Sequence, residues 1–299
     1  MQHLFAASQG RVKEGTGGVY PNRDCYTDLM PFDVSATVLT NTRLSHDYNV
    51  LALAAPQVAA AAIPGQFLMV KAATGHDPLL RRPFSVFEIL RDAAGTATGV
   101  SILVKRIGVS TELLYAAKPG DAVACLGPLG QPFTLVDPPA EGWMVAGGVG
   151  LAPFWTLAEA LVARGVKTTL FYGARRAAEL FYLDFFRTLG VDLVLTTEDG
   201  SAGETGRVIA PLDRALAARP ADQPVTLYAC GPEGMLAATA NTAAAYNRWC
   251  EVSVERIMGC GMGGCYSCIV PMKSESGGFH HIRSCIAGPV LDAAQIVWD

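Results

Sequence analysis

Charge is scarce in this sequence and is nowhere gathered into a run. Only 17% of the 299 residues are charged, the net charge is −4, and Lys and Arg never occur in runs longer than a pair. Proteins that bind nucleic acid need clustered basic residues to neutralise phosphates, so we expect no nucleic-acid partner. With 51% hydrophobic residues the chain can instead bury a sizeable core, and its length suits two or three small domains.

Long uninterrupted apolar runs are also missing. Leu51–Ile63 is short and contains Pro56, whereas Trp143–Val162 is rich in glycine and contains Pro153 and Glu159. Neither reaches the run of about 20 apolar residues that a membrane helix needs, so we expect no membrane span. The N-terminus lacks the basic stretch and apolar core of a secretory signal, which predicts a cytoplasmic location. Residues 1–32 have no regular period and are interpreted as an N-terminal extension.

The cysteines do not have the distribution of a disulfide framework. Cys25, Cys125, Cys230 and Cys250 are scattered, whereas the other four of the eight cysteines lie within residues 260–285. Disulfide frameworks belong mainly to small secreted domains. In a large chain without a secretory signal, a tight group of cysteines indicates a metal site.

Turn residues divide residues 33–139 into short strands. Pro64-Gly65, Lys118-Pro119-Gly120 and Gly127-Pro128 mark three of the turns. The strands predicted around them are Ser35–Asn41, Tyr48–Ala54, Gln66–Lys71, Phe84–Leu90, Val100–Lys105 and Asp121–Leu126. Six short strands at this spacing predict a small antiparallel β-barrel.

After Pro138-Pro139, predicted strands alternate with predicted helices. The strands are Trp143–Ala146, Thr168–Tyr172, Asp192–Thr197 and Pro224–Ala229; the helices are Leu151–Arg164, Ala177–Leu189, Pro211–Ala218 and Glu233–Tyr246. This alternation predicts a doubly wound parallel sheet over residues 140–250. Residues 251–299, which hold the cysteine group, are predicted to form a small third domain.

The most specific pattern is C-x4-C-x2-C followed by a fourth cysteine. Cys260, Cys265, Cys268 and Cys285 have the spacing of plant-type [2Fe–2S] ligands. Four thiolates must converge on one small cluster, and the three glycines between the first two cysteines permit a tight loop whose N–H groups point at the sulfurs. A structural zinc site is the alternative, although zinc sites usually use two short cysteine pairs. We therefore predict a [2Fe–2S] cluster.

A glycine-rich turn predicts a nucleotide site in the parallel sheet. Gly147-Gly148-Val149-Gly150 follows a predicted strand and opens a helix, where free N–H groups and the helix dipole can bind a pyrophosphate. Cys230-Gly231-Pro232 follows the last strand of the same unit. Because ligands bind at the carboxyl ends of parallel strands, the two motifs are predicted to share one crevice. The structural alternatives are a tight strand–helix turn and a small buried side chain at Cys230.

Arg82-Pro83-Phe84-Ser85 offers contacts for a flavin. Arginine suits a phosphate and can lie against an aromatic ring system, and Ser85 offers a hydroxyl and an amide. Taken alone, the segment would be interpreted as an ordinary edge strand with a surface arginine. Its interpretation depends on the motifs around it.

Together the motifs resemble the ferredoxin–NADP reductase superfamily. They are Pro64–Phe67, Arg82–Ser85, Lys118–Asp121, Gly147–Pro153, Tyr172–Arg175 and Cys230–Pro232. The stretch from Glu255 to Val290, with its four cysteines, is similar to the electron-transfer subunit of type B dihydroorotate dehydrogenase.

The resemblance implies FAD, a [2Fe–2S] cluster and NAD(H) as cofactors. By that resemblance, the FAD contacts are Arg82, Pro83, Phe84, Ser85, Leu103, Val104 and Lys105, with Ser110 and Thr111 at the pyrophosphate. The family usually has Gly-x-Gly-Thr at this last position, where Ser110 replaces a glycine. The NAD(H) contacts would be Gly147, Gly148, Gly150, Cys230, Gly231 and Pro232.

The cofactors imply an order of electron transfer. NADH gives two electrons as hydride, a [2Fe–2S] cluster moves one, and a flavin can do both, so the flavin belongs between them. The resemblance implies an oxidoreductase subunit without catalytic residues for a substrate of its own. Its acceptor would be the flavin of a separate catalytic subunit that interconverts dihydroorotate and orotate in pyrimidine biosynthesis, within a hetero-oligomer such as a heterotetramer.

Other functions remain open at this point. The same module serves anaerobic sulfite reductases and the small subunit of NADH-dependent ferredoxin:NADP oxidoreductase, which would change the acceptor. A redox sensor or a zinc-binding module is the non-enzymatic alternative. Arg175 and Arg176 could accept the 2′-phosphate of NADPH or form a solvated turn, whereas the family favours NADH. His280 and His281 are interpreted as a surface pair.

Overall fold

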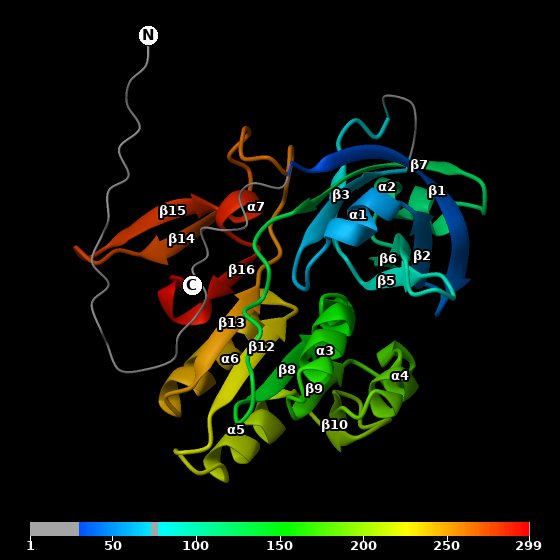
Figure 1. The fold of residues 1–299 in the computed structure, drawn as a ribbon. Coiled ribbons are helices and arrows are strands. Elements are labelled where there is room, and N and C mark those ends of the chain that lie inside the picture. Colours follow the sequence, from blue (N-terminus) through cyan, green and yellow to red (C-terminus); the bar gives the residue numbers. More distant parts are fainter. Residues whose placement is uncertain (1–29, 73–76, 299) are drawn as a thin grey trace.

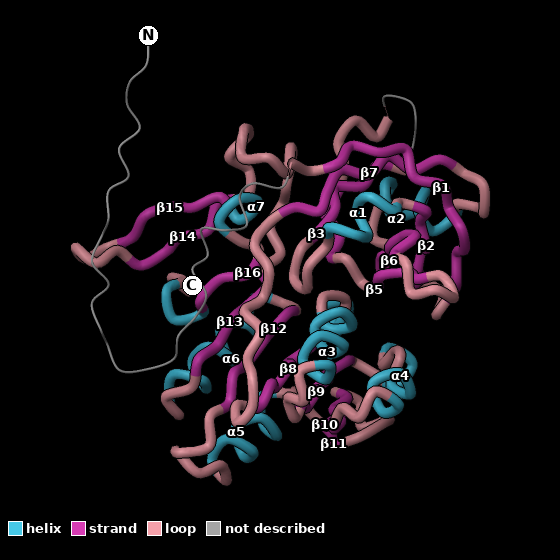
Figure 2. Tube along the Cα trace, in the orientation of Figure 1, coloured by secondary structure: helices cyan, strands magenta, loops and turns pink. Residues whose placement is uncertain are grey.

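The computed structural model describes residues 30–72 and 77–298 (Figure 1). Most of the predicted N-terminal extension, Cys25 included, lies outside the described residues. Two seven-stranded sheets and a small hairpin follow one another along the chain, with helices between them (Figure 2). No helix in the described ranges is long and apolar enough to cross a membrane.

A curled antiparallel sheet comes first in the chain. Its strands are β1 (Phe32–Arg43), β2 (Tyr48–Ala54), β3 (Phe67–Lys71), β4 (Arg82–Ser85), β5 (Glu88–Arg91), β6 (Ala97–Lys105) and β7 (Ala122–Leu129). They pair in the order β4-β3-β7-β1-β2-β6-β5, and alternate residues such as Leu51, Leu53, Val100 and Ile102 form its core. The predicted antiparallel barrel is confirmed as a curled sheet with β4 and β5 at its edges. Two short helices, α1 (Pro56–Ala61) and α2 (Val109–Ala116), accompany it.

The predicted single strand Phe84–Leu90 is wrong, because the segment forms two strands. The Val86 N–H donates to the carbonyl of Gln66 beside β3, whereas the Phe87 N–H donates to the carbonyl of Ser101 in β6. The chain therefore changes pairing partner between Val86 and Phe87. The spacing of apolar residues along the segment does not reveal this change of pairing partner.

The second sheet is parallel except at one edge. Its strands are β8 (Glu141–Gly147), β9 (Thr168–Ala174), β10 (Asp192–Thr197), β11 (Glu204–Thr205), β12 (Val225–Cys230), β13 (Trp249–Ser253) and the antiparallel β16 (Val290–Asp292). They pair in the order β11-β10-β9-β8-β12-β13-β16. The order reverses direction between β8 and β12, which makes this pair the topological switch point.

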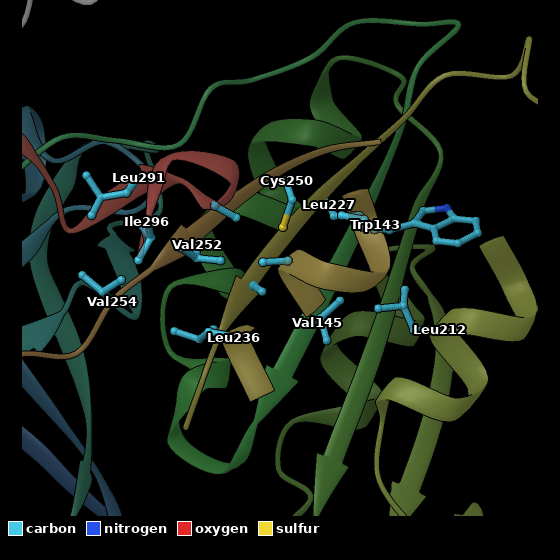
Figure 3. Close-up of a cluster of buried hydrophobic side chains, with 14 of the residues drawn as sticks. Trp143, Val145, Leu212, Leu227, Leu236, Cys250, Val252, Val254, Leu291 and Ile296 are labelled. Carbon is cyan, nitrogen blue, oxygen red and sulfur yellow. The ribbon is translucent and has the colours of Figure 1, made fainter. Parts of the chain in front are cut away.

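Helices cover both faces of the second sheet and confirm its doubly wound class. Helices α3 (Phe154–Ala163) and α4 (Leu183–Thr188) pack Leu157 and Phe186 on one face. Helices α5 (Ile209–Ala217) and α6 (Glu233–Ala245) pack Leu212 and Leu236 on the other, against Val145 of β8 (Figure 3).

The predicted helix Ala177–Leu189 is also wrong as one element. It contains a 3-10 turn, η3 (Ala177–Glu179), and then α4, with Tyr182 between them at a φ of 57°. The Tyr182 ring packs edge-on against Phe87 and Trp155, with centroid distances of 5.1 and 5.2 Å. This aromatic contact between the two sheets holds Tyr182 in a conformation that a tyrosine seldom adopts, and so interrupts the helix.

The C-terminal residues form a small unit that is anchored in the second sheet. Strands β14 (Ile269–Lys273) and β15 (Phe279–Arg283) form a projecting hairpin, followed by α7 (Ser284–Ala287) and, after β16, η4 (Ala293–Gln295) (Figure 1). The unit begins directly after β13 and returns through β16, which pairs with β13. The unit that carries the grouped cysteines is therefore fixed to the second sheet at both ends.

Candidate functional site

The four predicted cluster ligands lie at the junction of the C-terminal unit and the first sheet. Cys260, Cys265 and Cys268 come from the loop between β13 and β14, and Cys285 lies in α7. Cys265 is exposed and Cys260 half-buried, whereas Cys268 and Cys285 are each only 2% exposed. The site therefore has a solvent side and a buried side.

The thiols lie in two pairs. Cys260 lies beside Cys265, and Cys268 lies beside Cys285. Within the described part of the chain, no three His, Cys, Asp or Glu side chains gather around one point as a lone metal ion requires. A [2Fe–2S] cluster held by four cysteines has two irons to ligate, so two thiol pairs fit it better than they fit one zinc ion.

Hydrogen bonds favour the thiolate form on the solvent side. The Ser267 hydroxyl lies 3.1 Å from Cys265 Sγ, and its hydrogen bond lowers the pKa of Cys265 to about 6. Ser267 Oγ also accepts from the Gly259 N–H at 2.9 Å, and the Met262 N–H donates to Cys260 Sγ at 3.4 Å. On the buried side, desolvation raises the pKa of Cys285 to about 12, so this thiol ionises only with a positive partner such as iron.

The loop takes its shape from two glycines and one arginine. Gly261 and Gly263 have φ values of 73° and 80°, whereas Gly264 does not need a positive φ. Arg283 donates to the Gly263 carbonyl at 2.6 Å and lies 4.6 Å from the centre of the Tyr266 ring. Arg283 thus joins the two turns between which Cys265 lies.

The buried side of the cluster site packs against the first sheet. Cys268 and Cys285 belong to one hydrophobic cluster with Phe67 and Met69 of β3 and Leu129 of β7. Strand β3 pairs with β7 along one edge and with β4, the predicted flavin strand, along the other. Only one strand therefore separates the cysteines from the residues expected to meet FAD.

Arg82, in β4, carries a positive charge that no carboxylate of the described residues pairs with. Its guanidinium donates to the carbonyls of Leu80 and Arg81, at 3.4 and 3.2 Å, and among the described residues it forms no ion pair. The neighbouring Arg81 is instead paired with Asp33 at 2.6 Å. Arg82 is therefore the better placed of the two arginines to bind an anionic ligand.

The other residues of β4 divide between the faces of the sheet. Pro83 lies opposite Met69 and Ser85 opposite Phe67, so both are on the face where the cysteines lie. Phe84 packs against the core of the first sheet. All four predicted flavin residues, Arg82 to Ser85, are half-buried.

The end of β6 and the start of α2 lie at the same end of the first sheet. Leu103 and Val104 are buried, and Lys105 Nζ lies 5.4 Å from the centre of the Tyr48 ring. Thr111 Oγ1 accepts from the N–H groups of Ile107 and Gly108 at 2.9 and 3.0 Å. The Thr111 hydroxyl therefore shapes the turn that opens α2.

Ser110 does not disturb this turn. It lies within the first turn of α2 and is not among the described residues with positive φ. The conformational freedom of the glycine that usually stands at this position is therefore not needed here.

The two predicted nucleotide motifs meet at the switch point. A Cβ on Gly150 would lie 2.0 Å from the carbonyl oxygen of Cys230, and one on Gly147 would lie 2.9 Å from Pro232 Cδ. Glycine is therefore required for the loop after β8 to touch the loop after β12. Gly148 opens the 3-10 turn η2 (Gly148–Leu151) with a φ of 56°. The Cys230 side chain is buried, which raises the pKa of its thiol.

Sequence reasoning missed Glu255, which lies in the same crevice just beyond β13. Its side chain is accessible to solvent, yet the surrounding protein raises the pKa of its carboxyl, and the Lys105 ammonium acts in the opposite direction. A cavity of about 160 Å³ is lined by Gly231, Pro232 and Glu255, among others. Glu255 therefore lies where the first sheet, through Lys105, faces the end of β12. Glu255 opens the cysteine-bearing stretch on which the family resemblance rests, but nothing in that stretch assigned it a role at the nucleotide crevice.

The two arginines after β9 differ in their environment. Arg176 forms an ion pair with Glu179 at 3.0 Å, and Arg175 is exposed. His280 and His281 lie exposed on β15, as a surface pair would.

Three family models match the chain in order. Residues 35–133 match an oxidoreductase FAD-binding domain, residues 144–241 an oxidoreductase NAD-binding domain, and residues 255–297 the iron–sulfur cluster binding domain of dihydroorotate dehydrogenase B. These matches confirm the predicted cofactors FAD, NAD(H) and an iron–sulfur cluster.

Two relatives of the chain are each named dihydroorotate dehydrogenase B (NAD(+)), electron transfer subunit. The relative from Desulforamulus reducens is 36% identical over 245 residues, which are 82% of this chain and 90% of the relative. The relative from Geobacillus kaustophilus is 39% identical over 236 residues, 78% of this chain and 86% of the relative. Among solved structures, an NADH-dependent reduced ferredoxin-NADP oxidoreductase matches 89% of this chain and 91% of its own, with a TM-score of 0.76 and 27% identity.

Proposed function

The chain belongs to the family of electron transfer subunits of dihydroorotate dehydrogenase B, and from this premise we propose which of its residues carry electrons between NAD(H) and a catalytic partner. It is an oxidoreductase subunit with FAD, NAD and iron–sulfur domains. The observation that carries the proposal is the packing of Cys268 and Cys285 on β3, one strand away from β4.

Arg82 anchors FAD in this proposal. Its guanidinium lacks a carboxylate partner among the described residues, so it can bind a phosphate or lie against the flavin ring. Pro83, Phe84 and Ser85 line the same strand, and Leu103, Val104 and Lys105 continue the site at the end of β6. Ser110 and Thr111 hold the pyrophosphate at the start of α2, where the first N–H groups of a helix have no intrahelical carbonyl partner.

The nucleotide lies over the switch point of the second sheet. Gly147, Gly148 and Gly150 receive its pyrophosphate, and Cys230, Gly231 and Pro232 border the nicotinamide ring. Glu255 adds a carboxylate at that end of the crevice, which favours the positively charged ring of NAD⁺ over the neutral ring of NADH.

Cys260, Cys265, Cys268 and Cys285 ligate the [2Fe–2S] cluster. FAD, when bound by these residues, would supply the conversion between two-electron and one-electron transfer that NADH and a [2Fe–2S] cluster require between them. The chain's own residues supply binding, orientation and exclusion of water, and none is assigned acid–base catalysis. The division of the chain near residues 32, 139 and 250 stays a prediction.

The partner is a catalytic subunit that bears its own flavin, and together they interconvert dihydroorotate and orotate. We propose that it docks at the solvent side of the cluster loop. Cys265 is exposed there, and so are the apolar side chains of Met262, Tyr266 and Ile286. Methionine and aromatic residues are enriched in such contacts. Thiolate ligands and a nicotinamide donor suit the reducing cytoplasm, where we place the complex.

A different electron acceptor, in place of the dihydroorotate partner, is the second candidate function. The matching solved structure comes from a ferredoxin-NADP oxidoreductase, in which the same fold serves a different complex. The curated relatives are more similar in sequence than that structure, and they favour the dihydroorotate partner.

The test begins with the purified chain. Flavin bands with a broad iron–sulfur shoulder in its visible spectrum, and bleaching of both by NADH, are expected. A spectrum without either feature would contradict the proposal and would favour a zinc-binding module.

A further inference from the structure

Met69 lies between the two proposed redox sites. It occupies the middle of β3 and is fully buried. Within the sheet it pairs with Pro83 of β4 on one side and with Leu126 of β7 on the other. Its side chain belongs to the hydrophobic cluster that contains Cys268 and Cys285.

The register fixes the face from which the Met69 side chain projects. Residues directly opposite each other on antiparallel strands point to the same face, so Met69 and Pro83 share a face. The neighbours of Met69 along β3, Leu68 and Val70, point into the core of the first sheet. Met69 therefore projects from the face on which the cluster site lies, beside the flavin strand.

The cluster loop lies directly on the Met69 side chain. A Cβ on Gly261 would lie 2.4 Å from Met69 Cγ and 3.1 Å from Sδ, and 3.3 Å from Leu129 Cδ1. Gly261 follows Cys260 and has a φ of 73°. No larger residue fits at Gly261 without moving either the loop or Met69.

We propose that Met69 is a positioning residue that sets the separation between the flavin and the cluster. The proposal rests on the proposed function, in which β4 meets FAD and the cysteines ligate the cluster. A long unbranched thioether fills the irregular space between β3 and the loop, and a shorter side chain leaves a gap into which the loop can move. The transfer itself moves one electron from reduced FAD to the oxidised cluster and changes no bond in Met69.

The inference is tested with three variants of the holoprotein. Met69→Leu conserves volume, Met69→Val shortens the side chain, and Gly261→Ala pushes the loop from the other side. After mixing with NADH, flavin bleaching is followed by stopped-flow absorbance and cluster reduction by freeze-quench electron paramagnetic resonance. Iron content and flavin content are measured for each variant, so that rates refer to loaded protein only.

Flavin reduction by NADH is expected to be unchanged in all three variants. Met69→Leu should reduce its cluster within about twofold of the wild-type rate, because volume-conserving exchanges are tolerated best. Met69→Val should speed cluster reduction severalfold, because the loop can move toward β3, and Gly261→Ala should slow it severalfold, because the new methyl group pushes the loop away from β3. The double variant Met69→Ala with Gly261→Ala should be faster than Gly261→Ala alone, because it lacks the Met69 Cγ atom against which the new methyl group presses.

Two results would overturn the inference. One is a loaded Met69→Val protein that reduces its cluster at the wild-type rate with only a lower melting temperature, which is what a purely structural role predicts. The other is a double variant no faster than Gly261→Ala alone, which also decides the matter if Met69→Val does not fold. Failure of NADH to reduce the flavin of the wild-type chain would contradict the proposed function instead.

Discussion

Glu251 accepts two hydrogen bonds from Thr134, one from the backbone N–H at 2.8 Å and one from the hydroxyl at 2.7 Å. Glu251 is fully buried in β13, and Thr134 lies in the segment that leaves the first sheet. The Tyr228 hydroxyl of β12 donates to the Thr134 carbonyl at 2.7 Å. The segment between the two sheets is therefore held, at Thr134, against β13, the strand that leads into the cluster loop. This contact helps to position both sheets and the loop.

Removal of the Thr134 hydroxyl should destabilise the protein. Thr134→Val keeps the backbone hydrogen bond but leaves one oxygen of the buried Glu251 carboxylate without its hydroxyl donor. We expect the free energy of unfolding to fall by roughly 1–3 kcal/mol, as for other hydrogen bonds to buried charged groups. Denaturant unfolding measures the change, and Thr134→Ser, which retains the hydroxyl, is the matched control. Equal stability of the Val and Ser variants would show that the contact is dispensable.

Loss of one exposed thiolate should remove the cluster and spare the flavin. Cys265→Ala deletes the ligand whose thiolate form is favoured by Ser267, while β4 and α2 are untouched. We expect loss of the visible iron–sulfur absorption with FAD still bound. Cys125→Ala, at a buried cysteine within the first sheet, should keep both. A full iron content in Cys265→Ala would mean that the ligand assignment is wrong.

Arg82 and Arg81 offer a matched pair for testing the flavin site. Arg82→Ala removes a guanidinium that has no carboxylate partner among the described residues, and a charge-assisted hydrogen bond of about 1.5–3 kcal/mol corresponds to a roughly tenfold to hundredfold weaker affinity for FAD. Arg81→Ala breaks only the ion pair with Asp33 and should change the affinity little. Flavin retention after dilution and gel filtration gives the comparison, and equal retention by the two variants would remove Arg82 from the site.

Glu255 should discriminate between oxidised and reduced nicotinamide. Because desolvation by the surrounding protein raises the pKa of Glu255, its carboxylate is lost as the pH falls through that raised value, and the affinity for NAD⁺ should fall with it. Glu255→Gln should weaken NAD⁺ binding about tenfold at neutral pH, change NADH binding less, and abolish this pH dependence. Titration calorimetry measures both ligands. Glu204→Gln, at an exposed surface ion pair, is the control; an unchanged ratio of the two affinities in Glu255→Gln would argue against the role.

The sequence alone predicted the parts of the site whose chemistry is local. The cysteine spacing is imposed by the cluster itself, and Gly147 and Gly150 are imposed by the close approach of the loops after β8 and β12. The class of both sheets also followed from strand spacing and strand–helix alternation. The residue assignments for the cofactors remain predictions.

Contacts between distant parts of the chain could not be predicted in this way. Met69 contacts Gly261, and the Lys105 ammonium acts on the Glu255 carboxyl, only after the two sheets and the C-terminal unit are in place. The same is true of the break before Phe87, where the strand changes partner, and of Tyr182, whose backbone conformation depends on a ring contact across the interface. In each of these places tertiary packing overrides local pattern.

The most direct measurement asks whether this chain converts the pyrimidine by itself. The account predicts rapid NADH oxidation by the isolated holoprotein with an artificial acceptor such as ferricyanide. It also predicts that no orotate is formed from dihydroorotate and NAD⁺ until a flavin-bearing catalytic subunit is added. Formation of orotate is followed by absorbance with and without that subunit, in the same preparation. Turnover that begins only with the partner is the predicted result, and turnover by this chain alone would contradict the relay.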